Sequence, residues 1–572
     1  MLSVRVPLRF ALSRRSLLGT VLLCVALLAG DVASRRAGAH GQAATQPLRV
    51  HFEPDDPLWV DADMLVDASG VAPQELSQSY DFLENTFALK GDQRDVRAMN
   101  VNTLDEVPDS SWFTNRIGHR PIDDGALVRG PNSLPALQAS GWTIVAGKNT
   151  GLQPGFRAVI TGANDSQLYQ LEFDPPGYPH LATGAEMIGT LLYHALGYHV
   201  VENYIVYVDV DTLTIDPKAT YRDRDGRKQP FTRDTLDRLL WRAARSNDGT
   251  YRALASRFAP GKPAGQFRYN GTRPDDPNDI YPHEHRRELR AARVFAAWVN
   301  HDDSRANNTL DMIEGDGGQS AVRHYMFDFG SIMGSGTTGP DTARSGRAYL
   351  IDGPMAWRVL RTFGLWAPSW ARRHILPYHP SVGPYTADGF EPEEWRAEYP
   401  NAAFLNMRAD DAFWGARRVA AFTDAQLQLL AAQGRYSDPA ATAQVAQALI
   451  GRRDRIAKAW LTGVTPLVSP SLEGGRLRFA NAAVDARVAT APTSYVVQWQ
   501  RFDNETGRHA HVGPPITTST PEAPMPEELA QDPFVSADVH VVHPQYRHWS
   551  APVAFYFRRD AEGWTPVGLI RR

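Results

Sequence analysis

Alternating apolar and polar positions predict three β-strands between residues 142 and 173. Residues 142–146 are β-like, residues 156–160 alternate, and residues 168–173 alternate again. Turns that contain glycine, asparagine or aspartate separate these segments, and such residues bound short strands. The pattern therefore predicts a strand–turn–strand arrangement in this part of the chain.

Apolar residues at helical spacing predict a helix over residues 183–195, for which Gly197 is a natural stop. Residues 200–210 are expected to form a returning strand. The interval 212–282 is polar and rich in Arg and Asp. We interpret this interval as an insertion of helices and loop.

Helical periodicity dominates the next two hundred residues. A helix is expected over residues 284–298, because apolar side chains recur on one face. Further helices are expected over residues 355–373, 390–420, 424–434 and 438–462. Local groups of arginine are interpreted as solvated helix faces.

The segments on either side of this central region, residues 48–140 and the residues beyond 465, differ from it in composition. Residues 48–140 are rich in Asp, Pro, Asn and Ser, which predicts an irregular region with one helix over 76–87. Beyond residue 465, β-type segments alternate with Pro-rich loops. We expect residues 465–572 to form a small β-sandwich-like domain.

The first 39 residues have the order of a secretory signal. Basic residues precede an apolar run over residues 17–29, and small residues follow at 37–39. The run is shorter than the roughly 20 residues that a membrane-spanning helix needs, so no stable span is expected after cleavage. Residues 13–18 also resemble the twin-arginine motif. We expect a bacterial protein exported to the periplasm or beyond, by the twin-arginine or the general secretory route.

Composition narrows the chemistry. The only cysteine, Cys24, lies inside the expected signal, so the mature chain is expected to have no disulfide and no thiolate site. The formal charge of −4 on 572 residues is not that of a nucleic-acid binder, which needs concentrated Lys and Arg. No nucleic-acid partner is expected.

Two motifs carry candidate chemistry. Residues 301–308 read His-Asp-Asp-Ser-Arg-Ala-Asn-Asn, and residues 328–330 read Asp-Phe-Gly. The first matches the kinase pattern H-R-D-x-K-x-x-N at His301, Asp303, Arg305 and Asn308, and the second is D-F-G. Phosphoryl transfer needs a proton acceptor, oxygens that hold Mg²⁺ and positive charge along the phosphates. The alternative is a capped turn, because such turns favour Asp and Asn.

On these motifs, residues 142–463 resemble the protein-kinase-like superfamily, closest to its atypical exported branch of secretory-pathway and spore-coat kinases. The whole chain also resembles a group of exported bacterial proteins. The resemblance implies an α+β fold with a two-lobed core. For the whole chain we therefore expect five parts: a signal peptide (1–39), an irregular region (48–140), an N-lobe (141–211), a C-lobe with an insertion (212–463) and the C-terminal β domain (465–572).

The resemblance also assigns roles. Asp303 would be the catalytic base, and Arg305 would contact the transferred phosphate. Asn308 and Asp328 would hold Mg²⁺ or Mn²⁺ with ATP. Glu186 stands where the helix glutamate pairs with the phosphate-binding lysine.

The chain departs from the family at that lysine. Glu172 occupies its expected position on the third strand. A carboxylate there would repel Glu186 and the phosphates by about 4 kcal/mol at ~4 Å and an effective dielectric near 20. Lys148, in the loop that ends at Gly151, is the candidate replacement, as in the with-no-lysine kinases. The loop lacks G-x-G-x-x-G, and no A-P-E follows the D-F-G at a useful distance.

The motifs and their departures support two functional hypotheses. The first is an exported atypical kinase that transfers phosphate from Mg-ATP to a hydroxyl of a protein or a glycan. The second is an inactive pseudokinase that acts as a binding or scaffold module at the cell envelope. Glu172 favours the second hypothesis, and the retained Asp303, Asn308 and Asp328 favour the first. Other chemistry is unsupported, because His283 and His285 lack zinc-helix spacing and no G-x-S-x-G is present.

Overall fold

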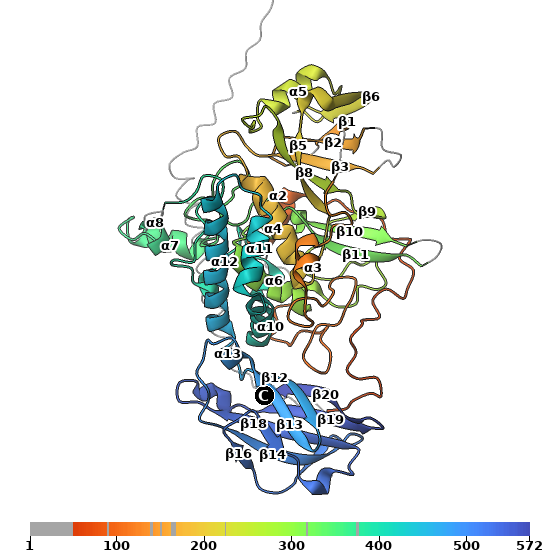
Figure 1. Cartoon of the computed structure of the whole chain (residues 1–572), viewed down its shortest axis with the longest axis vertical. Coiled ribbons are helices and arrows are strands. Elements are labelled where there is room, and N and C mark those ends of the chain that lie inside the picture. Colours follow the sequence, from red (N-terminus) through yellow and green to blue (C-terminus); the bar gives the residue numbers. More distant parts are fainter. Residues whose placement is uncertain are drawn as a thin grey trace, which may run out of the picture. The chain divides into compact units, whose positions relative to one another are not determined.

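The computed structural model (Figure 1) describes residues 50–88, 91–137, 141–148, 151–161, 167–223, 225–315, 319–372 and 377–572. The expected signal peptide lies outside these residues. Residues 52–503 and 508–572 form one compact unit. Helices and sheets mix along this unit, which confirms the predicted α+β class.

A seven-stranded sheet contains the predicted strand–turn–strand region. Its order is β5-β8-β3-β2-β1-β6-β7, and β1, β2 and β3 pair antiparallel. The predicted strands are confirmed. The seven strands are β1 (Trp142–Gly147), β2 (Gly155–Ile160), β3 (Tyr169–Phe173), β5 (Asn203–Val208), β6 (Leu213–Arg222), β7 (Lys228–Pro230) and β8 (Tyr251–Arg257).

The prediction of helices and loop over 212–282 was wrong. This interval contributes β6, β7 and β8 to the same sheet, with one α-helix, α5 (Arg233–Leu240), between them. The sheet therefore continues past residue 211. Strand β8 inserts between β3 and β5 and pairs with both. The alanines of β8 have no strong preference for a strand. The pairing of β8 with β3 and β5 therefore determines its conformation more than its local sequence does.

Helix α4 (Leu181–Leu196) follows β3, as predicted, and all but one of its residues are buried. The buried Asp174 carboxylate accepts hydrogen bonds from the backbone N–H groups of His180, Ala182 and Thr183 and so holds the helix start. Gly197 ends the helix with φ +125°, and a Cβ there would lie 2.2 Å from the Phe113 ring. Both ends of the helix that carries Glu186 are thereby fixed.

A second sheet, of order β4-β11-β10-β9, brings the two motifs together. Its strands are β4 (His199–Val200), β9 (Lys262–Gly265), β10 (Thr309–Glu314) and β11 (Ala321–Met326). In the β10–β11 hairpin Thr309 pairs with Met326. One residue further out, the Phe327 N–H donates to the Asn308 carbonyl at 3.3 Å. Asn308 before β10 and Asp328 after β11 therefore lie at the same end of the hairpin.

Helix α6 (Arg287–Val299) is buried along almost its whole length and packs against α10 and α12. Trp298 Nε1 donates to the Leu449 carbonyl of α12 at 2.9 Å. The predicted helices over 424–434 and 438–462 are confirmed as α11 and α12, whereas 355–373 divides into α7 and α8. The bounds are α7 (Gly353–Arg361), α8 (Ser369–Arg372), α9 (Ala402–Leu405), α10 (Ala409–Ala420), α11 (Asp424–Ala432) and α12 (Pro439–Trp460).

The interpretation of arginine groups as solvated faces was wrong for α6. Arg286, Arg287 and Arg290 are fully buried. Arg287 pairs with Asp105, Asp410 and Asp411, residues far away in the sequence. Burial of so much charge is possible only because distant carboxylates meet it, and no local pattern contains that information.

The N-terminal region is mostly irregular, as predicted, with α2 (Gln78–Phe87) and α3 (Asp124–Arg129). It belongs to the core rather than to a linker. The Trp112 indole stacks on the His324 imidazole of β11, with ring centroids 3.5 Å apart. Asn100 Nδ2 donates to Glu288 Oε2 of α6 at 2.5 Å.

The C-terminal β domain consists of a three-stranded and a six-stranded sheet. Trp499, Trp549 and Phe555 are fully buried in its core. Within the described residues, no helix is long and apolar enough to cross a membrane. The strands are β12 (Leu467–Glu473), β13 (Arg476–Asn481), β14 (Ser494–Asp503), β15 (Arg508–His511), β16 (Ile516–Thr518), β17 (Glu522–Pro524), β18 (Phe534–Val542), β19 (Val553–Asp560) and β20 (Gly563–Arg571).

Candidate functional site

The loop over residues 301–308 begins where α6 ends. Asn300 takes a left-handed conformation with φ +57°, which reverses the chain. The buried His301 ring then lies edge-on to Tyr193 and Phe329, with centroids 5.9 and 5.6 Å away. Burial lowers the pKa of His301 to about 3, so its imidazole is neutral and serves as packing between α4, the loop and the Asp-Phe-Gly segment.

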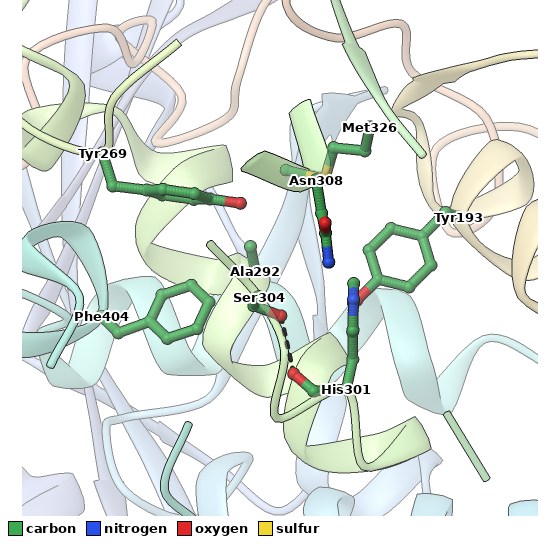
Figure 2. A pocket seen from close by; sticks show the side chains of 8 residues that line it. All are labelled: Tyr193, Tyr269, Ala292, His301, Ser304, Asn308, Met326 and Phe404. Carbon is green, nitrogen blue, oxygen red and sulfur yellow. Dashed lines mark hydrogen bonds between the residues drawn. The ribbon is translucent and has the colours of Figure 1, made fainter. Parts of the chain in front are cut away.

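Side chains of this loop line a small cavity (Figure 2). Its volume is about 10 Å³, and Tyr193, His301 and Asn308 are among its lining residues. The Ser304 hydroxyl, also at its wall, donates to the His301 carbonyl at 2.7 Å. That volume is about the size of one water molecule. The cavity is therefore too small for a ligand larger than about one water molecule.

Asp303 and Arg305 form a tight pair within the loop. Arg305 Nε lies 2.6 Å from Asp303 Oδ1, and Arg305 Nη2 donates to Asp303 Oδ2 at 3.0 Å. Arg305 Nη1 also donates to Glu398 at 2.9 Å. Asn308 Nδ2 donates to the Asp303 carbonyl at 2.9 Å. The structure thus brings three of the sequence-predicted site residues into one network, to which it adds Glu398.

Asp328 is held in a conformation that few residues adopt. Its φ is +66°, in the left-handed region that costs a non-glycine residue about 1 kcal/mol. The residue is exposed as a whole, but packing around its carboxyl group and repulsion by Glu172 raise the pKa of that group to about 6, against the attraction of Lys148 and Arg305. Asp328 is therefore accessible to a solute while charged groups from several elements surround it.

Lys148 and Gly151 lie together in the β1–β2 loop. Lys148 forms an ion pair with Glu172 of β3. At Gly151 φ is +88°, a conformation that favours glycine, and a Cβ there would lie 2.7 Å from Lys148 Nζ, so the end of the lysine side chain would have to move. The Lys148 ammonium group therefore lies beside β3, where the strand itself contributes the Glu172 carboxylate.

Glu186 has different partners from those that the resemblance implies. Its carboxylate accepts a hydrogen bond from the Phe329 backbone and faces Asn203 Nδ2 at 3.4 Å, whereas Lys148 pairs with Glu172. Burial, Asp328 and Glu172 all raise the pKa of Glu186 well above its ordinary range. The buried glutamate is therefore held in the protonated form more strongly than a solvated one.

Three side-chain oxygens converge on Gly330. A methyl group on this residue would lie 3.5 Å from Glu186 Oε2, 3.6 Å from Gln153 Oε1 and 3.9 Å from Asp328 Oδ1. Gln153 was not singled out from the sequence, since a lone glutamine in a loop carries no signal. The convergence shows that the β1–β2 loop, α4 and the Asp-Phe-Gly segment meet at one point.

We call Lys148, Glu172, Glu186, Asp303, Arg305 and Asp328 the Asp328 cluster. It combines four carboxyl groups with two cations, and each member either has its pKa shifted by another member or contributes to such a shift. Carboxylate oxygens suit a hard divalent cation, and Mg²⁺ in particular uses one or two carboxylates together with substrate phosphates. Among the described residues, no three His, Cys, Asp or Glu are arranged as a complete metal site.

The residues on either side of Gln153, Leu152 and Pro154, line a groove of about 410 Å³. Its size is that of small-molecule sites. An exposed indole, that of Trp241, and a guanidinium group, that of Arg242, form part of its wall. The lining residues are Leu152, Pro154, Pro175, Pro176, Trp241, Arg242 and Thr338.

Asp302 of the 301–308 loop forms a second pair of carboxyl groups with Asp341. The single Ser345 hydroxyl lies 2.5 Å from Asp302 Oδ2 and 3.0 Å from Asp341 Oδ2. Burial and Glu398 raise the pKa of Asp302 to about 6, and burial and Asp302 raise that of Asp341 well above its ordinary range. One hydroxyl proton cannot serve two carboxylates, so the pair is most stable when one member is protonated.

Asp341→Asn is expected to stabilise the protein at pH 8 and to have less effect at pH 4.5. An acid whose folded-state pKa is raised, as burial and Asp302 raise that of Asp341, stabilises the fold below its unfolded value near 4 and loses that contribution as pH rises through the folded value. Each tenfold change in the proton affinity of such a group corresponds to about 1.4 kcal/mol of stability. Urea unfolding at both pH values measures the difference, with the exposed Asp225→Asn as control. An equal effect at both pH values would contradict the shared proton.

No protein-family model, curated protein or solved structure matches this chain. The functional assignment therefore depends on the geometry of the site.

Proposed function

We propose that residues 142–463 form a protein-kinase-like two-lobed core that transfers a phosphoryl group from Mg-ATP or Mn-ATP to a hydroxyl of a protein or a glycan. The supporting observation is that two cations from distant parts of the chain, Lys148 and Arg305, both lower the pKa of the Asp328 carboxyl group. They are 157 positions apart in the sequence. A base candidate, two cations and an accessible carboxylate then share one cluster. Phosphoryl transfer requires this combination.

In this proposal, different residues hold the metal, accept the proton and supply positive charge. Asp328 and Asn308 would hold the metal, which neutralises developing charge on the phosphates. Asp303 would accept the proton of the attacking hydroxyl, and burial raises its pKa well above its ordinary range despite the opposing effect of Arg305, while Glu398 and Asp328 add to the rise. A raised pKa brings a carboxylate base closer to the working pH. Arg305 holds Asp303 in place and supplies positive charge beside it.

A second candidate function is a pseudokinase that binds a partner without turnover at the cell envelope. The observation that favours it is the Lys148–Glu172 ion pair. A lysine that neutralises a carboxylate of its own sheet is less available to a phosphate. Catalysis requires that phosphate oxygens compete with Glu172 for Lys148 or that Arg305 supplies the missing charge.

Nucleotide with Mn²⁺ or Mg²⁺ is expected to stabilise the full chain, and Asp328→Ala is expected to remove that effect. Binding to the folded state alone adds about 2.7 kcal/mol at a ligand concentration 100 times Kd. Thermal unfolding with and without 2 mM Mn-ATP measures it. Asp225→Ala, a change at an exposed aspartate, is the matched control and should keep the shift.

The outcomes separate the two candidates. Equal stabilisation of the parent and Asp328→Ala would contradict the role of Asp328. Stabilisation that depends on Asp328 without release of ADP in the presence of protein or glycan acceptors would favour the pseudokinase. Stabilisation with ADP release supports the kinase.

A further inference from the structure

Helix α7 and the turn behind it expose large apolar side chains. No residue of α7 is buried. Trp357 is 52%, Leu360 64%, Phe363 94% and Leu365 86% exposed. Isolated exposed apolar residues are ordinary, but a contiguous group of this kind marks an interaction surface. We call α7 together with residues 362–366 the α7 patch; α7 is labelled in Figure 1.

The apolar residues of α7 form one outward stripe. Gly353, Ala356, Trp357 and Leu360 recur at spacings of three and four, so they share a helix face, and all four are exposed. Met355 and Val359 turn the other way and are half-buried. The helix already has an inner face against the protein, so its outer stripe is a second apolar face that the folded chain leaves uncovered.

The turn after α7 holds a phenylalanine out into solvent at a conformational cost. Phe363 has φ +50° and Gly364 φ +78°, and the Gly364 N–H donates to the Val359 carbonyl at 2.9 Å. The left-handed region is a rare conformation for a bulky side chain. A strained residue whose ring is almost fully exposed gains nothing from the fold itself, which points to a role in binding.

The two charged side chains within the α7 patch, Arg358 and Arg361, are both basic, and Asp352, the N-cap of α7, lies just before the patch. Residues 353–387 contain no Asp or Glu, whereas the whole chain has 64 acidic residues in 572. Arg358 and Arg361 are exposed beside the apolar stripe, and the Arg358 guanidinium stacks over the Trp366 ring at 4.3 Å. An apolar stripe that contains Trp, Leu and Phe and is bordered by arginine has the composition of a segment that lies in a membrane interface.

We propose that the α7 patch docks the protein on an anionic lipid surface. Trp357, Leu360 and Phe363 enter the boundary between headgroups and acyl chains, and Arg358 and Arg361 contact lipid phosphates. The charge complementarity with anionic headgroups selects this partner over a neutral surface. The docking contacts use no residue of the Asp328 cluster, so vesicle binding can be tested separately from phosphoryl transfer.

The α7 patch is tied to the catalytic loop. The Leu350 N–H, three residues before α7, donates to the Glu398 carbonyl at 2.6 Å. The Glu398 side chain in turn accepts from Arg305, the partner of Asp303. The segment that leads into the α7 patch is therefore connected through Glu398 to the loop that carries Asp303, and a preference for acceptors at the lipid surface would rest on the proposed function.

Vesicle co-sedimentation of the full chain tests the proposal. We expect at least tenfold tighter binding to vesicles of 70% phosphatidylcholine and 30% phosphatidylglycerol than to phosphatidylcholine alone, with weaker binding at 0.5 M NaCl. Trp357→Ser/Phe363→Asn should weaken binding at least tenfold, and asparagine tolerates the left-handed conformation. Arg361→Glu should reduce the preference for anionic vesicles.

The control is Trp241→Ser/Leu134→Ser, which removes two exposed apolar side chains elsewhere in the chain and should leave vesicle binding unchanged. Equal binding by the control and the Trp357→Ser/Phe363→Asn variant would overturn the proposal. So would no binding to either vesicle. Light scattering that shows self-association dependent on Trp357 and Phe363 would assign the α7 patch to a second copy of the chain and would equally overturn it.

Discussion

Arg287→Met is expected to lower the free energy of unfolding by about 3–5 kcal/mol, because removal of one partner of a buried ion pair leaves the other uncompensated. Arg287 is fully buried in α6. Its Nη1 lies 2.7 Å from Asp105, its Nη2 2.9 Å from Asp410 and its Nε 3.0 Å from Asp411. Methionine fills the space of the side-chain stem but leaves these carboxylates without the cation.

The pH dependence of this loss distinguishes charge from packing. Although burial works in the opposite direction, Arg287 and two other arginines hold the pKa of Asp105 well below its usual range. A carboxylate with a depressed pKa stabilises the fold above its unfolded value near 4 and loses that contribution as pH falls towards the folded value. The difference between the parent and Arg287→Met should therefore shrink below about pH 4.

Urea unfolding at pH 7 and pH 3.5 measures both effects. Arg233→Met is the matched control, because Arg233 forms an exposed pair with Asp237 on α5. Such surface pairs contribute about 0–1 kcal/mol. If Arg287→Met proved as stable as the control, the buried network would not be a determinant of the fold.

Asp303→Asn is expected to lower kcat by about 10²–10⁴-fold, the usual contribution of a general base, while nucleotide binding persists. Asparagine keeps the size of the side chain and a hydrogen-bond acceptor for Arg305 but cannot take the proton. Asp328→Ala should instead lose nucleotide binding. The two variants thereby separate the chemical step from metal and nucleotide binding.

Single-turnover phosphate transfer with a saturating acceptor measures the Asp303→Asn effect. Asp302→Asn is the adjacent control, because its carboxylate faces Ser345 and the Gly346 backbone; it should retain activity within about threefold. An Asp303→Asn variant with the activity of the parent would exclude Asp303 as the base. Loss in Asp302→Asn alone would move the assignment by one residue.

The candidate site could be predicted from the sequence only in part. Asp303, Arg305 and Asn308 fall within eight residues of each other, so any turn brings them together. Lys148 and Asp328 are distant along the chain, and the structure shows them in one cluster. Glu398, Gln153 and Asp341 carried no signal, because each is an isolated polar residue whose partners lie on other elements.

The sequence by itself determined the local elements of this protein. The strands of residues 142–173, helix α4 and the helices after residue 424 follow from the period of their apolar residues, since side-chain direction repeats with the backbone. The same local rules place the two motifs at the ends of a helix and of a strand. These features depend on neighbours within a few residues, so a single sequence contains them.

Only the tertiary structure decided where β8 pairs, why the arginines of α6 are buried and which carboxylate holds Lys148. Each depends on groups that meet across tens to hundreds of residues. Alanine-rich β8 becomes a strand because β3 and β5 satisfy its backbone groups on both sides. Arg287 can be buried because Asp105 and Asp411 supply the opposite charge. Pairing and charge compensation are properties of proximity in space, which the order of residues along the chain does not state.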